Sequence, residues 1–152
     1  MKAVIQRVRE ASVEVGGHTV GSIGRGLLVL VGIGKDDASK DMDWMIDKII
    51  NLRIFEKEGK FDESLIDVDG ELLLVSQFTL YGDCSKGRRP SFSNSMEVEK
   101  ARNLFEVFVR KAKDKVARVE TGVFQAHMEV KLTNDGPVTL ILDSKKTRVG
   151  AE

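Results

Sequence analysis

The chain is poor in the residues that mark out special classes of protein. It has one cysteine, Cys84, in 152 residues, so no disulfide can form within the chain and a reducing, cytoplasmic location is expected. Lys and Arg number 24 and Asp and Glu also number 24, so no net charge attracts nucleic acid in general. No apolar run reaches the length of a membrane helix, and the charged, alternating N-terminal stretch does not resemble a signal peptide. These absences predict one soluble globular domain over residues 1–152.

The common catalytic and ligand-binding motifs are missing as well. The chain has no P-loop, no GxGxxG after a strand, no HExxH and no CxxC. Its two histidines, His18 and His127, are far apart and have no cysteine partner at ligand spacing, so we expect neither a metal site nor a cofactor. Cys84 lies beside Asp83 in a polar loop without a flanking base, which favours a passive thiol over a nucleophile.

The apolar patterns that are present predict a mixed α/β fold. Alternation on both sides of Gly16-Gly17 predicts an N-terminal hairpin, and the runs at 26–34 and 71–82 predict strands buried on both faces. Helical spacing predicts helices at about 38–55 and 95–115, the second with a capping box formed by Asn94 and Glu97. Two helices and six or more strands do not alternate as βαβ units, so we expect a mixed sheet with both helices on one face. A homodimer would cover its open strand edges.

Two short stretches are candidates for a functional site. SQFTL, residues 76–80, places polar groups where a buried strand ends, although a plain strand with Thr79 on its solvent face is the simpler interpretation. NDGPVT, residues 134–139, contains a hairpin signal between two alternating segments, and we expect the chain to turn there. Pro137 follows at once and has no amide hydrogen for a ladder, so it either begins an edge strand or has a special role.

These residues resemble the D-aminoacyl-tRNA deacylase family over nearly the whole chain. The segments that carry the resemblance are VIQRVREASVEV, GLLVLVGIG, KIINLRIF, VSQFTL, KGRRPSF, TGVFQAHM and NDGPVT. The resemblance implies three layers in the order β/β/α and a homodimer with its active site at the subunit interface. It also implies hydrolysis of the ester bond of D-aminoacyl-tRNA, and of glycyl-tRNA mischarged on tRNA(Ala), without a cofactor.

The resemblance also implies roles for the two stretches. The residues expected around the scissile ester are Ser76, Gln77, Phe78 and Thr79. Backbone amides there would stabilise an oxyanion, and the 2′-hydroxyl of the terminal ribose would assist without an essential side-chain nucleophile. Gly136 and Pro137 would form a cis peptide inserted into the partner's site, where two carbonyls exclude the side chain of an L-amino acid.

Further positions are implied for contacts with the tRNA. Phe124 and Ala126 correspond to the segment that binds the terminal adenosine, where aromatic packing on a base is common. Gln125 stands where glycine is expected and adds bulk and an amide near that pocket. In KGRRPSF, the cationic residues Lys86, Arg88 and Arg89 either meet acceptor-stem phosphates or form an ordinary solvated loop.

Two other functions remain open from the residues alone. One is a different small hydrolase that uses Thr79 as a nucleophile, for which His127 is the only histidine that could serve as the base. The other is a dimeric module that holds a tRNA 3′ end without catalysis. Release of amino acid from D-Tyr-tRNA but not from L-Tyr-tRNA would separate the deacylase from both.

Overall fold

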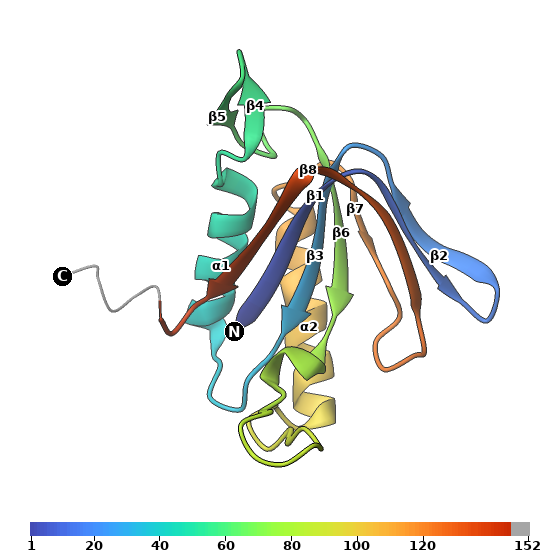
Figure 1. Cartoon of the computed structure of the whole chain (residues 1–152), viewed down its shortest axis with the longest axis vertical. Helices are drawn as coiled ribbons and strands as arrows, with labels where there is room; N and C mark the ends of the chain where they lie inside the picture. The colour runs from blue at the N-terminus through green and yellow to red at the C-terminus, as the bar shows by residue number, and fades with distance from the viewer. Residues whose placement is uncertain (147–152) are drawn as a thin grey trace.

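The computed structural model describes residues 1–146, which form a mixed sheet with two helices (Figure 1). The helices are α1 (Ser39–Asn51) and α2 (Val98–Lys113), and a short 3-10 helix, η1, covers Phe78–Tyr81. The strands are β1 (Lys2–Val15), β2 (His18–Ile23), β3 (Gly26–Gly32), β4 (Phe55–Lys57), β5 (Lys60–Glu63), β6 (Glu71–Ser76), β7 (Val119–Thr121) and β8 (Glu129–Asp143). Neither α1 nor α2 is long and apolar enough to span a membrane.

The long strand β1 organises the main sheet. On one side its first half pairs with β3 and its second half with β2, while β8 pairs along its other side. These three pairings are antiparallel, whereas β3 with β6 and β6 with β7 are parallel. The strand order is therefore β2-β1-β3-β6-β7, with β8 on the far side of β1, and the sheet is mixed, as predicted. The N-terminal hairpin turns at Gly16 and Gly17, which both have positive φ.

The central strands β3 and β6 separate two hydrophobic cores, as their continuous apolar runs predict. Leu27 and Leu72 belong to the core beneath the helices, which contains Met45 of α1 and Phe108 of α2. Their chain neighbours Leu28 and Leu73 belong to a second core, together with Val8, Ala11, Val13 and Ile23 of β1 and β2. The sheet therefore curls over itself, and the helices cover one face, which gives the expected β/β/α layers.

The expected hairpin at NDGPVT is wrong, because β8 runs continuously from Glu129 to Asp143. β1 is long enough to pair with both halves of β8, so the chain does not need to turn back on itself. The turn signal instead produces a bulge in which Asp135 to Val138 lie opposite the single residue Arg7. Bulge residues are outside the ladder, so Pro137 fits there without an amide hydrogen. The Asn134 side chain donates to the carbonyls of Arg7 (2.8 Å) and Val138 (3.0 Å) and bridges the interruption.

The helix boundaries also differ from the predicted ones. The predicted capping box is wrong: Glu97 is itself the N-cap of α2, and its carboxylate accepts from the amides of Glu99 and Lys100. Helix α1 ends at Asn51, and Phe55 begins a short hairpin of β4 and β5 that projects from one end of the molecule (Figure 1). The loop that follows η1 lies at the opposite end.

Candidate functional site

Strand β6 delivers the SQFTL segment to the end of the sheet. The strand stops at Ser76, where the amide of Gln77 donates to the carbonyl of Val31 (2.8 Å), and the chain then tightens into η1. Gly32 permits this close approach, because a Cβ there would lie 2.9 Å from Leu80 Cβ and 3.1 Å from Gln77 O. Residues 78–81 are therefore a 3-10 turn, and the predicted strand is shorter than its apolar run suggests.

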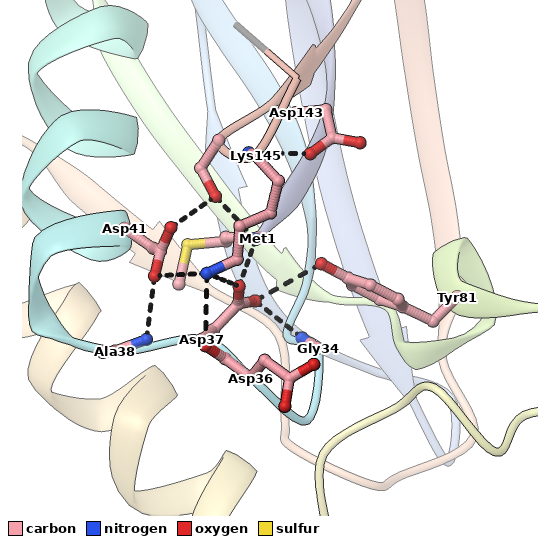
Figure 2. A network of polar contacts seen from close by, with 10 residues as sticks. Met1, Gly34, Asp36, Asp37, Ala38, Asp41, Tyr81, Asp143 and Lys145 are labelled. Atoms are coloured by element: carbon pink, nitrogen blue, oxygen red, sulfur yellow. Dashed lines mark hydrogen bonds and ion pairs between the residues drawn. The ribbon is translucent and has the colours of Figure 1, made fainter. Parts of the chain in front are cut away.

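A buried polar network holds the last residue of η1 (Figure 2). Tyr81 donates its hydroxyl hydrogen to Asp37 (3.3 Å), and the same carboxylate accepts from the amide of Gly34 (2.7 Å) and from the amino group of Met1. Burial and the charge of Asp37 raise the pKa of Tyr81 well above its ordinary value. Lys2 Nζ lies 4.7 Å from the centre of the Tyr81 ring. This network ties the SQFTL segment to the loop before α1.

One face of the SQFTL segment lines a pocket of about 670 Å³. Three parts of the chain that are distant in sequence meet there: the end of β6, the segment leading into α2, and the segment between β7 and β8. The pocket is mostly apolar with a few polar groups, which is usual for small-ligand sites. Its lining residues include Ser76, Gln77, Phe78, Phe92, Ser95, Met96, Glu97, Val98, Ala101, Phe124, Gln125, Ala126, His127 and Met128.

Two exposed aromatic rings stand at this pocket. Phe78 is 59% exposed and Phe92 is 37% exposed, and their rings meet edge to face with centres 5.0 Å apart. Ser95 Oγ donates to the carbonyl of Phe78 (3.3 Å), which fastens the loop before α2 to the SQFTL segment. Phe92 was not predicted as a site residue, although it lies within KGRRPSF. Periodicity gives no signal for such a residue, because it is neither in a strand nor in a helix.

Phe124 and Ala126 both lie in the remaining wall of the pocket. Phe124 is half-buried and packs against the main core, with its ring centre 6.1 Å from that of Phe105 on α2. Phe124 is thus a core residue on one side and a pocket residue on the other.

Thr79 does not have the surroundings of an activated nucleophile. Its hydroxyl accepts a short hydrogen bond from the side-chain amide of Gln77, and an amide cannot act as a general base. Thr79 is not among the residues that line the pocket, whereas His127 is. Within residues 1–146 no cluster of three His, Cys, Asp or Glu side chains is arranged to hold a metal ion.

Gly136 and Pro137 are exposed and lie far from this pocket within the same chain. Their peptide bond is cis, as the resemblance implies. Arg7 of β1 faces them. Arg7 pairs with Leu27 of β3, and Leu27 pairs with Leu72 of β6. Ser76 lies four residues further along β6. Four residues correspond to roughly 13 Å along a strand, and three strand spacings to roughly 14 Å across the sheet. The two signature motifs are therefore on the order of 20 Å apart in one chain.

The predicted cationic residues lie in the exposed loop after η1. Lys86, Arg88 and Arg89 do not line the pocket, and none forms an ion pair with another residue in the described part of the chain. Phe92, three residues after Arg89, does line the pocket.

Known proteins are similar to this chain over nearly its whole length. The family described as D-Tyr-tRNA(Tyr) deacylase matches residues 4–143. The chain is 62% identical to the D-aminoacyl-tRNA deacylase of Clostridioides difficile (strain 630), covering 97% of this chain and 99% of that protein. It is also 62% identical to the D-aminoacyl-tRNA deacylase of Thermosipho africanus, covering 96% and 99%.

Solved structures share the fold. A protein described as c-Myc DNA Unwinding Element Binding Protein has a TM-score of 0.90 at 44% identity and covers 94% of this chain and 98% of its own. A probable eukaryotic D-amino acid tRNA deacylase has a TM-score of 0.82 at 17% identity, covering 93% and 97%, and shows likeness of fold alone. From the match over residues 4–143 and the relatives at 62% identity, this chain belongs to the D-Tyr-tRNA(Tyr) deacylase family.

Proposed function

We propose that this protein hydrolyses the ester bond of D-aminoacyl-tRNA and that the pocket beside β6 receives the aminoacylated 3′-terminal adenosine. The observation that carries the proposal is the meeting of the SQFTL segment and the Phe124–Ala126 segment in one mainly apolar pocket. The first segment offers backbone amides to an ester, and the second offers an aromatic ring to a base. We propose a cytoplasmic location, because aminoacylated tRNA is used there.

The chemistry proposed for this pocket needs no side-chain nucleophile. The amide of Gln77 is already bonded to Val31, whereas the amide of Phe78, which lines the pocket, has no acceptor within residues 1–146 and is available to an oxyanion. Removing one such donor from an oxyanion site typically costs on the order of 10²–10³ in kcat. The neighbouring 2′-hydroxyl of the substrate ribose is the group we propose to assist the reaction, because Thr79 has no base.

We propose that the active protein is a homodimer in which Gly136 and Pro137 of one subunit enter the pocket of the other. The separation of the two motifs within one chain supports this arrangement, because they cannot meet in the same subunit without breaking the sheet. Two backbone carbonyls placed against the α-carbon of the substrate would exclude an L side chain. Glycine has no side chain to exclude, so the same site would also cleave glycyl-tRNA mischarged on tRNA(Ala). Lys86, Arg88 and Arg89 would then contact phosphates of the acceptor end.

The decisive experiment compares release of tyrosine from D-Tyr-tRNA and L-Tyr-tRNA by the purified protein. We expect hydrolysis of the D-ester only. The rate of hydrolysis should fall severely when the tRNA ends in 2′-deoxyadenosine, which lacks the 2′-hydroxyl. Tight binding of both charged tRNAs without hydrolysis would instead identify a binding module. Undiminished cleavage of the 2′-deoxy substrate would contradict the proposed role of the ribose hydroxyl.

The molar mass of the protein in solution tests the proposed homodimer. Light scattering should give about twice the chain mass of 16.9 kDa. An active species of 16.9 kDa would contradict the shared pocket.

A further inference from the structure

Gln125, a residue of the pocket wall, has an unusual backbone conformation. Its φ is +68°, in the left-handed region that favours glycine, and it is one of three non-glycine residues with positive φ in the described part of the chain. Gln125 lines the pocket together with its neighbours Phe124 and Ala126. A side chain retained in a conformation that favours glycine calls for a compensating interaction.

Arg102 of helix α2 supplies that interaction. Its Nη2 donates to Gln125 Oε1 (3.0 Å), and its guanidinium carbon lies 4.8 Å from the centre of the Phe124 ring. Phe105, three residues further along α2, packs against the same ring. One helix therefore orients both Phe124 and Gln125.

The contact with Arg102 determines which way the Gln125 carboxamide points. Arginine only donates hydrogen bonds, so the carboxamide must turn its oxygen toward Arg102 and its NH₂ group away. Within residues 1–146 nothing accepts a hydrogen bond from Gln125 Nε2. The pocket wall thus carries an oriented donor without an acceptor of its own.

We propose that Gln125 is a specificity residue for the terminal nucleoside and that Arg102 is its positioning residue. Gln125 Nε2 donates to an acceptor nitrogen of the terminal adenine, while Arg102 holds the carboxamide and the Phe124 ring in place. This inference rests on the proposed function, because it takes aminoacylated adenosine as the ligand. Adenine offers ring nitrogens as acceptors and therefore matches an amide donor.

Two substitutions at Gln125 separate the role of its NH₂ donor from the role of its contact with Arg102. Gln125→Glu keeps the shape and strengthens the contact with Arg102, but it removes the NH₂ donor. Gln125→Gly removes both and suits the positive φ, so it should fold well. We expect each to raise KM for D-Tyr-tRNA roughly 3- to 10-fold, the range of one neutral hydrogen bond, with kcat changed less than twofold.

Substitutions at Arg102 test its positioning role. Arg102→Met should raise KM at least as much as Gln125→Glu, and Arg102→Lys should recover part of the loss because it retains a charged donor. Arg110→Met is the matched control, since Arg110 is an exposed arginine in the last turn of the same helix. Urea unfolding of each variant distinguishes a KM effect from a loss of stability.

Substrates ending in 1-deaza-, 3-deaza- or 7-deazaadenosine identify the acceptor. The wild-type protein should lose affinity for one of them, and Gln125→Glu should show no further loss for that analogue. Equal KM values for wild-type protein and Gln125→Glu, or equal sensitivity of both to every analogue, would overturn the inference while leaving the proposed function intact. Failure of the wild-type protein to cleave D-Tyr-tRNA would instead overturn both.

Discussion

Gly34 is the position at which a single methyl group should disturb the SQFTL segment from a distance. A Cβ built on Gly34 would lie 2.6 Å from Tyr81 Cζ and 2.7 Å from its Cε1 and hydroxyl oxygen. The ring cannot easily swing away, because Asp37 accepts its hydroxyl hydrogen and Lys2 lies over its face. Gly34→Ala must therefore displace Tyr81 together with η1, to which the pocket residue Phe78 also belongs.

The size of the effect follows from the overlap. Carbon atoms in contact are about 3.5–4.0 Å apart, so the ring must move by about 1 Å. Overpacking of this kind costs roughly 1–3 kcal/mol of folding free energy. A displacement of about 1 Å at a catalytic group can lower the rate on the order of 10²-fold, so we expect kcat/KM of Gly34→Ala to fall on that order.

The assay is deacylation of D-Tyr-tRNA together with urea unfolding of the same preparations. Gly24→Ala is the matched control, because the nearest atom to its added Cβ is Glu71 Oε2 at 3.9 Å. A second change, Tyr81→Leu in the Gly34→Ala protein, removes the overlapping ring atoms and should restore part of the activity. If Gly34→Ala loses stability but keeps kcat/KM within twofold of the control, Tyr81 does not position the site.

Three further predictions concern the site and its support. Thr79→Ala should retain measurable deacylation, whereas loss on the order of 10⁶-fold in a folded variant, as in triad enzymes, would restore Thr79 as a nucleophile. Phe124→Ala should weaken binding of the charged 3′ end by roughly 1–3 kcal/mol in a titration, and unaltered binding would leave Phe124 a core residue only. Asp41 is buried, which opposes its ionisation, but hydrogen bonds from Ala38, Lys145 and Ser144 lower its pKa from 3.8 to about 2. Its contribution to stability is therefore full above pH 4 and lost as the pH falls toward 2, and Asp41→Asn should lack this part of the acid transition in unfolding curves.

Local hydrophobic patterns predicted the strands that are buried on both faces and the helices that bury one apolar stripe. The apolar runs predicted β3 and β6, and helical spacing predicted α1 and α2 to within a few residues, because burial of alternate or periodic positions is recorded in the sequence itself. The turn at Gly16-Gly17 was also predictable, since few residues other than glycine adopt its positive φ.

The sequence alone also marked SQFTL and NDGPVT as the candidate stretches. Which chain segments meet around them was decided only by the tertiary structure. Asn-Asp-Gly-Pro signals a turn, yet it forms a bulge, because the partner of β8 is the distant strand β1 and not its own neighbour. Arg102 and Gln125 meet for the same kind of reason, since α2 packs beside the segment after β7. Periodicity records how much of a residue is buried, but a contact between distant segments depends on how whole elements pack, and no local pattern carries that information.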